Sequence, residues 1–213
     1  MNDHGRLIAA AGVMVAMLAF APFGARAADR AEVKVGEVEA MREMFRGFSP
    51  RGQAELSRLR QDDIQKFCSA PGWEKQKART KQLEAEQLKL VKYPADGKLM
   101  GNWQAGERVA QAGVGMQFSD ERGSTAGGNC YACHQMSGTE VSFGTIGPSL
   151  RNFGKTRGNT EAIQRYTYGK IYNAQAYSAC SNMPRFGHGG ILTEQQMKAL
   201  PALLLDPNSP INK

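Results

Sequence analysis

The stretch that decides the fold lies in the second half of the chain and reads Cys130-Tyr131-Ala132-Cys133-His134. Two cysteines separated by two residues and followed at once by histidine form the attachment motif for covalently bound haem. Each thiol adds to one vinyl group of the porphyrin, and the adjacent histidine is placed to bind the iron as proximal ligand. The motif therefore predicts one covalently attached haem, held by Cys130 and Cys133, with His134 as an iron ligand.

Two other kinds of site use a Cys-x-x-Cys pair. A zinc site needs further ligands, and the sequence has neither a second cysteine pair nor a His-x-x-x-His pair to complete a tetrahedral set. A thiol redox couple usually lies between a strand and a helix, a context that the preceding Gly127-Gly128-Asn129 does not suggest. Haem is therefore the favoured cofactor, and we find no catalytic constellation beyond it.

The second iron ligand has few candidates. Met136 is too close to His134 to reach the opposite face of the haem, and Met197 belongs to the apolar stripe of a helix. Met183 lies in a proline-bounded loop without helical or strand period, so it is the expected ligand, with His188 as the alternative. Methionine favours the ferrous state, and six-coordinate iron leaves no open position, so the site is expected to transfer electrons.

The first 27 residues have the pattern of an export signal. Arg6 supplies a positive charge, residues 7–20 form an apolar run too short to span a bilayer stably, and Ala25-Arg26-Ala27 fits a cleavage site. We expect a periplasmic mature protein without a membrane span; an uncleaved anchor is the alternative. The chain carries a net charge of +7, but the basic residues are scattered, so the sequence does not indicate a nucleic-acid partner.

The two remaining cysteines are Cys68 and Cys180. An exported protein meets an oxidising compartment, which favours a disulfide between them. This bond would tie an amino-terminal extension to the haem domain. The open alternative is a free, reactive Cys180 close to the iron, in which case the protein would be a haem or thiol enzyme.

Apolar residues recur at helical spacing through most of the chain, and no alternation long enough for a sheet is present. The pattern predicts helices over residues 37–48, 53–67, 71–92, 103–112, 160–172 and 193–205. Small residues such as Gly106 would allow another helix to approach closely. Thr193 to Gln196 has the form of a capping box, whereas Pro201 is expected to kink the last helix or to replace its final turn.

A bend at Gly147-Pro148 follows the haem motif. A backbone carbonyl near this bend is a candidate acceptor for the N–H group of the His134 ring, which would fix the orientation of the imidazole. An ordinary turn without this contact is the alternative.

The order of these features resembles the class I cytochrome c fold: a helix before the haem motif, the Gly-Pro bend, a Met-Pro loop and a terminal leucine-rich helix. Three segments more specifically resemble the SoxX family of sulfur-oxidation cytochromes, namely residues 147–150, 177–187 and 204–212. The resemblance implies an all-α class I cytochrome c domain over residues 98–213. Residues 28–97 would then be a helical amino-terminal extension, which the family core does not require.

The SoxX resemblance also implies a biological setting. Members of this family are the small haem subunits of the SoxXA complex, an L-cysteine S-thiosulfotransferase, in which thiosulfate is joined oxidatively to a cysteine sulfur at the haem of the SoxA subunit. The chain would pair with a SoxA-type cytochrome, serve the SoxYZ carrier protein through the complex and pass electrons to a downstream cytochrome, without being catalytic alone. A free-standing periplasmic electron carrier of another pathway is the alternative. Carried onto this sequence, the family's haem residues are Cys130, Cys133, His134 and Met183.

Overall fold

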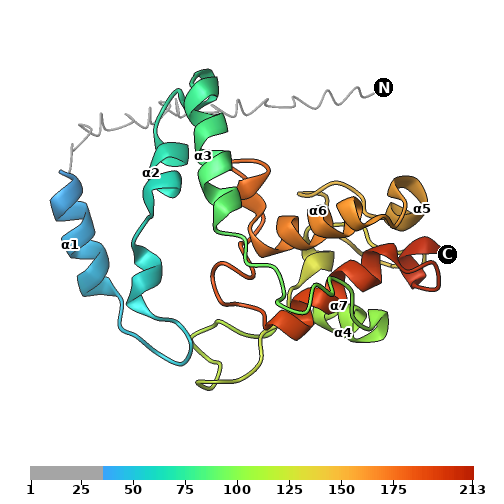
Figure 1. Cartoon of the computed structure of the whole chain (residues 1–213). Helices are drawn as coiled ribbons and strands as arrows, with labels where there is room; N and C mark the ends of the chain where they lie inside the picture. Colours follow the sequence, from blue (N-terminus) through green and yellow to red (C-terminus); the bar gives the residue numbers. More distant parts are fainter. Residues whose placement is uncertain (1–35) are drawn as a thin grey trace, which may run out of the picture. The chain divides into compact units, whose positions relative to one another are not determined.

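The computed structural model describes residues 36–213, and in this part of the chain the secondary structure consists of helices without a β-strand (Figure 1). The α-helices are α1 (Glu37–Gly47), α2 (Asp63–Ser69), α3 (Lys77–Lys89), α4 (Trp103–Gln111), α5 (Phe153–Arg157), α6 (Glu161–Tyr172) and α7 (Glu194–Leu205). Short 3-10 helices are η1 (Leu56–Leu59), η2 (Trp73–Lys75), η3 (Cys130–Ala132), η4 (Ala174–Ala176) and η5 (Pro210–Asn212). The all-α prediction is confirmed, whereas the predicted export signal, residues 1–27, lies outside the described residues.

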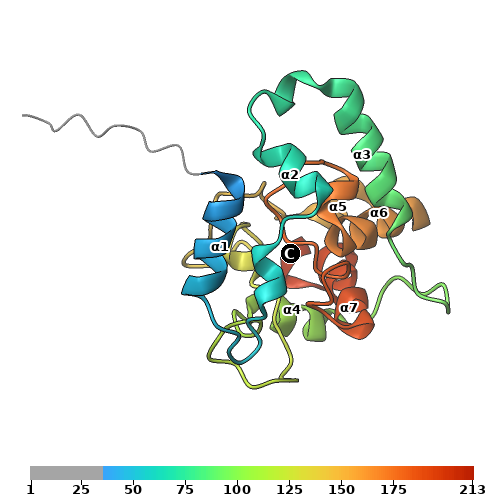
Figure 2. The same ribbon diagram turned by 90° about the vertical axis from the view of Figure 1, so that its left-hand side faces the viewer.

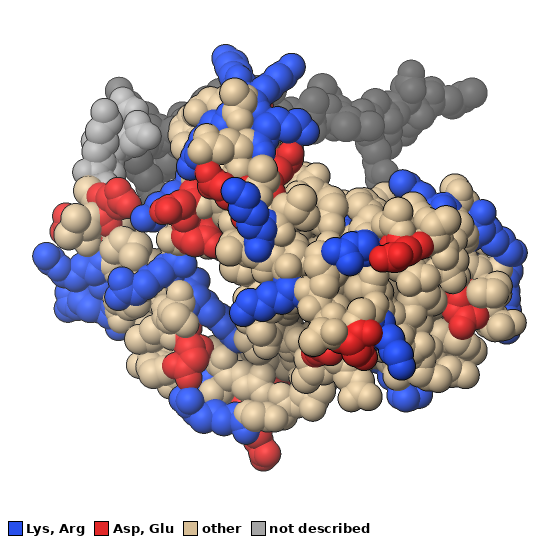
Figure 3. Space-filling view, viewed as in Figure 1, with Lys and Arg blue, Asp and Glu red and all other residues tan. Residues whose placement is uncertain are grey.

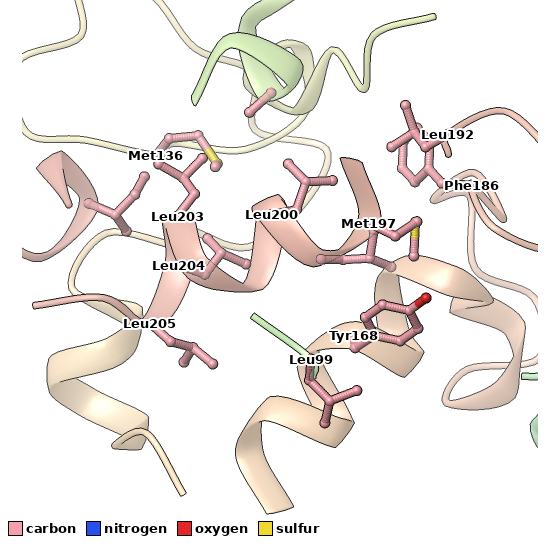
Figure 4. Close-up of a cluster of buried hydrophobic side chains, with 13 residues drawn as sticks. Leu99, Met136, Tyr168, Phe186, Leu192, Met197, Leu200, Leu203, Leu204 and Leu205 are labelled. Carbon is pink, nitrogen blue, oxygen red and sulfur yellow. The ribbon is translucent and has the colours of Figure 1, made fainter. Parts of the chain in front are cut away.

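Helix α7 forms the centre of the core. Its capping box is present, since the Thr193 hydroxyl accepts a hydrogen bond from the backbone N–H of Gln196, and the Gln196 side chain accepts one from the backbone N–H of Thr193 at 2.9 Å. The leucines of α7 and Met197 pack against Tyr168 of α6 and against Leu99 (Figure 4). Of the two effects expected of Pro201, replacement of the last turn is wrong, because α7 continues through the buried Pro201 ring to its end at Leu205, while a kink stays a prediction.

Helix α4 lies directly against α7. A Cβ atom on Gly106 would come within 2.2 Å of the Ala199 carbonyl oxygen, so only glycine permits this approach of the two helices. The backbone N–H of Gly101 also donates to the Lys198 carbonyl at 2.9 Å. The predicted close contact of a small-residue helix is thus confirmed, and it fixes the segment that leads to Cys130.

The two helices predicted over residues 53–67 and 71–92 are interrupted in the structure. Asp62 has extended backbone and caps α2, so the first segment divides into η1 and α2. Gly72 adopts the left-handed conformation, with φ at 79°, and α3 starts only at Lys77. Local capping and a glycine turn therefore override the apolar periodicity at both places.

Residues 37–213 form one compact unit, in which α2 and α3 pack on the remainder of the chain (Figure 2). Ile64 of α2, Leu83 of α3 and Ala179 form a second, smaller apolar cluster. The side-chain amide of Asn173 donates to the Gln87 side-chain oxygen at 2.9 Å, which joins α3 to the end of α6. The predicted domain boundary at residues 97 and 98 stays a prediction.

The surface charge is mixed. Lys and Arg side chains are spread over the face seen in Figure 3 and are interspersed with acidic side chains. Among residues 36–213, no helix combines the length and the apolar character needed to cross a membrane.

Candidate functional site

A cavity of about 860 Å³ is lined by residues of α5, α6 and α7 and by the loops around residues 128–151 and 178–186. Its size lies within the range of about 300–1,000 Å³ that is usual for sites of small molecules and cofactors. Cys130, Cys133, His134 and Met183 all line this cavity. The structure thus brings together the four residues that the sequence singled out, although Met183 comes from a segment well separated from the other three.

Cys130 and Cys133 present unpaired thiols to the cavity. Cys130 starts η3, and both cysteines are free and partly buried. Burial raises the pKa of the Cys130 thiol to about 12, so this group is neutral at physiological pH. A redox-active thiol pair works through a lowered thiol pKa, which makes the Cys130 environment unsuited to that alternative.

The ring of His134 is fixed by a backbone contact. Its Nδ1 atom lies 2.7 Å from the carbonyl oxygen of Pro148. Because a carbonyl can only accept a hydrogen bond, Nδ1 carries the proton, and the lone pair is on Nε2. The predicted contact between the imidazole and the Gly147-Pro148 bend is confirmed, and it gives His134 the tautomer that a metal ligand requires.

Gly147 lies against the face of the His134 ring. A Cβ atom at this position would be 2.2 Å from Cε1 and 2.5 Å from Nδ1 of the histidine. The backbone N–H of Gly147 donates to the Cys133 carbonyl at 2.8 Å, which ties the bend to the motif itself. Glycine is therefore required here by close approach, because any side chain would displace the imidazole.

We expect Gly147→Ala to lower the free energy of unfolding by about 1–3 kcal/mol, the usual cost of overpacking a tightly filled site. Urea unfolding followed by circular dichroism measures this change. Gly47→Ala is the matched control, because a Cβ atom there would meet no atom within 4 Å. Equal unfolding midpoints for the two variants would contradict the assigned role of Gly147.

The candidates for the second iron ligand differ in position. Met183 lines the cavity and is partly buried against the main core, whereas His188 is exposed and is not part of the lining. Met136 also reaches the cavity wall, but it is 1% exposed and packed in the core, as is Met197. Among these residues, Met183 has the position that a loop-borne ligand needs.

Three basic residues line the cavity and were not identified from the sequence: Arg151, Arg157 and Lys170. The Lys170 ammonium group donates to the Ala174 carbonyl at 3.2 Å, and burial lowers its pKa. Haem carries two propionate carboxylates, and cationic side chains beside an otherwise apolar cavity complement them. Their signal in the sequence is weak, because isolated basic residues also occur all over the surface.

Cys68 and Cys180 form a disulfide, with their Cα atoms 5.4 Å apart. The predicted pairing is confirmed, and it removes the alternative of a free, reactive Cys180. Cys180 also lines the cavity, three positions before Met183. The disulfide therefore joins the amino-terminal extension to the wall of the site.

The residues present fit a covalently bound haem: two free thiols, an imidazole with a fixed tautomer, a methionine and a largely apolar cavity. Comparison with known proteins points the same way. Residues 120–206 match the cytochrome c family. An uncharacterised lipoprotein of Aquifex aeolicus (strain VF5) is 34% identical over 211 residues, which cover 98% of this chain and 99% of the relative.

The match to the Aquifex protein extends over nearly the whole chain, so it includes the extension that a cytochrome c core does not require. The cytochrome c match implies covalently bound haem c and a role in electron transfer. The chain therefore belongs to the same family as the Aquifex protein and is a c-type cytochrome with an all-α class I cytochrome c fold.

Proposed function

We propose that this cytochrome holds one haem through Cys130 and Cys133, with His134 and Met183 as iron ligands, and transfers electrons within a periplasmic thiosulfate-oxidising complex of the SoxXA type. The observation that carries the haem assignment is the convergence of these four residues on one cavity. The SoxXA assignment is supported by the resemblance of residues 177–187, the segment that contains Met183.

Each residue has a distinct task in this proposal. Haem bound in the cavity supplies a one-electron redox centre. The two cysteines would hold it covalently, and His134 would offer Nε2 to the metal, because its Nδ1–H group donates a hydrogen bond to the Pro148 carbonyl. Met183 would serve as the second ligand and favour the ferrous state. Leucines of α7 close the cavity with apolar surface and keep water away.

The carboxyl-terminal segment that resembles SoxX has a structural task in this chain. The Asn212 side chain donates to the carbonyl oxygens of Leu204 at 3.0 Å and Asp206 at 2.9 Å, and accepts a hydrogen bond from the backbone of Gly154. These contacts satisfy carbonyl groups at the end of α7 and fasten α5 beside it. Because this segment has a structural task, its resemblance to SoxX says little about a partner. The resemblance that supports a SoxA-type partner is therefore mainly that of residues 177–187.

An exposed apolar loop favours a subunit over a free-standing carrier. Val141, Phe143 and Ile146 follow the haem motif and are exposed to 103%, 40% and 76%, and Ile146 also lines the cavity. The backbone N–H of Gly144 donates to the Tyr131 carbonyl at 3.0 Å, so this loop lies beside the motif. Apolar side chains gathered at the surface commonly mark protein contact sites. A protein partner covering this loop would lie next to the haem.

Purification of the native protein from its source at low ionic strength tests the proposal. We expect a second c-type cytochrome to copurify in a heterodimer, and the complex to be reduced when thiosulfate and a carrier protein with a reactive cysteine are added. A monomer that binds no second cytochrome would contradict the SoxXA assignment. That result would favour the free-standing electron carrier.

We further propose export to the periplasm with cleavage after residue 27. The Aquifex relative is named a lipoprotein. Of the four cysteines in this chain, two form the disulfide and two are proposed to attach haem. None of these four would then carry a lipid. Amino-terminal sequencing of the mature protein tests the cleavage site.

A further inference from the structure

The loop that carries Met183 is held on both sides of this methionine by the amino-terminal extension. Before it, the Glu84 carboxylate accepts a hydrogen bond from the backbone N–H of Ala179 at 3.2 Å, and Cys180 is bonded to Cys68. After it, Arg185 forms an ion pair of 2.7 Å with Asp62. Glu84 lies on α3, Cys68 lies on α2, and Asp62 caps α2, so both helices take part (Figure 2).

We propose that α2 and α3 position Met183 as an iron ligand by holding residues 179–185 against the cavity. This inference rests on the proposed function, in which Met183 binds the iron. It gives a task to an extension that the cytochrome c core does not require. Asp62, Glu84 and the Cys68–Cys180 disulfide are then positioning groups, because they act through the loop and not on the haem.

Few hydrogen bonds within residues 179–185 hold this loop in place. Its own contacts are short-range: Ser181 donates its backbone N–H to the Ser178 carbonyl at 3.0 Å, and the Ser181 hydroxyl accepts from the Met183 backbone N–H at 3.2 Å. Asn182 and Pro184 on either side of Met183 are exposed. Segments with few buried contacts open locally at low free-energy cost, so the restraints from the extension decide how often the loop opens.

The ion pair of Asp62 and Arg185 is the restraint best suited to a test. The Arg185 side chain is 16% exposed and that of Asp62 is 41% exposed. The second terminal nitrogen of Arg185, Nη1, is buried and has no hydrogen-bond partner among residues 36–213. Removal of the Asp62 charge would leave a largely buried guanidinium group uncompensated, which favours an open loop in which Arg185 reaches water.

The test is titration of the oxidised, haem-loaded full-length protein with imidazole, which competes with a methionine ligand whenever the loop opens. Absorption in the long-wavelength iron-sulfur band reports the fraction of protein with methionine bound. The apparent Kd for imidazole is inversely proportional to the fraction of open loop. We expect Asp62→Asn to lower this Kd by about tenfold, the change that about 1.4 kcal/mol in the opening equilibrium produces.

The choice of asparagine separates the ion pair from the helix cap. Oδ1 of Asp62 accepts a hydrogen bond from the Gln65 backbone at 2.9 Å, while Oδ2 contacts Arg185. Asparagine is an equally good cap but would direct its amide N–H groups at the guanidinium. The second variant is Asp62→Ser, because serine also caps a helix but its side chain is too short to reach Arg185. It should lower the Kd for imidazole by the same factor.

Asp96→Asn is the matched control. It breaks another ion pair between the extension and the remainder of the chain, Asp96 with Lys198 at 2.9 Å, in which the basic partner is likewise 16% exposed. Lys198 lies on α7, outside the Met183 loop, so the Kd for imidazole should change by less than about twofold. A merely structural role of Asp62 would change the urea unfolding midpoint and leave the Kd for imidazole as in the control.

The outcomes distinguish this inference from the proposed function. If wild-type protein shows the iron-sulfur band and Asp62→Asn binds imidazole like Asp96→Asn, the positioning role is overturned and Met183 remains a ligand. If wild-type protein lacks the band, both the ligand assignment and the positioning role are overturned. A tenfold lower Kd for imidazole in the Asp62 variants alone would support both the positioning role and the assignment of Met183 as an iron ligand.

Discussion

Replacement of Met183 by alanine is expected to lower the reduction potential by roughly 0.2 V, a fraction of the span of about 0.8 V that axial ligands cover. In the proposed ligand set the thioether favours the ferrous state, and its loss would leave one iron position open. The reduced variant should therefore bind carbon monoxide, whereas the wild type, with both positions filled as proposed, should not. Potentiometric titration and the absorption change on addition of carbon monoxide measure the two effects.

Two further variants make the Met183 result specific. Met44→Ala removes another partly buried methionine, which lies on α1 and does not line the cavity, so it should leave the potential unchanged. His188→Ala removes the alternative ligand and should also have no effect. A fall in potential with His188→Ala and none with Met183→Ala would overturn the ligand assignment.

Removal of the disulfide by Cys68→Ala together with Cys180→Ala is expected to lower the free energy of unfolding by up to about 4.7 kcal/mol, the value that chain entropy gives for a loop of roughly 100 residues. The sequence separation of the two cysteines is 112 residues. Urea unfolding without reductant measures the change. Haem content and electron transfer should be retained, because neither sulfur belongs to the proposed ligand set.

The same double variant separates a structural disulfide from a reactive thiol. Wild-type protein with its disulfide chemically reduced should unfold at the same urea concentration as the variant. Unchanged stability together with lost electron transfer would contradict the structural role and would point to chemistry at Cys180. A lower Kd for imidazole in this variant is also expected, since Cys180 precedes Met183 by three residues.

The chemistry of the site was predictable because it is encoded locally. The spacing of Cys130, Cys133 and His134 is dictated by the porphyrin, and the capping box at Thr193 is a contact within one turn of helix. The bend at Gly147-Pro148 is also a local signal, although its contact with His134 was one of two alternatives. The requirement for glycine at position 147 becomes apparent only in the structure, where the His134 ring lies against it.

The contacts that hold the Met183 loop were not predictable in the same way. Glu84 and Ala179 are 95 residues apart, and Asp62 and Arg185 are farther apart still. The side chains of Asp62 and Glu84 are 41% and 18% exposed, and a single carboxylate at a helix cap or within a charged helix has no distinctive sequence pattern. Their role follows from tertiary packing. Apolar periodicity alone joined η1 to α2 and η2 to α3, because it does not register the cap at Asp62 or the left-handed turn at Gly72.

The central claim is that the chain binds haem covalently and supplies two iron ligands, His134 and Met183. The absorption spectrum of the oxidised, purified mature protein tests this most directly. We predict a low-spin haem spectrum with a weak long-wavelength band from iron-sulfur ligation, unchanged by added carbon monoxide after reduction. A colourless protein, or a spectrum of five-coordinate haem, would contradict it.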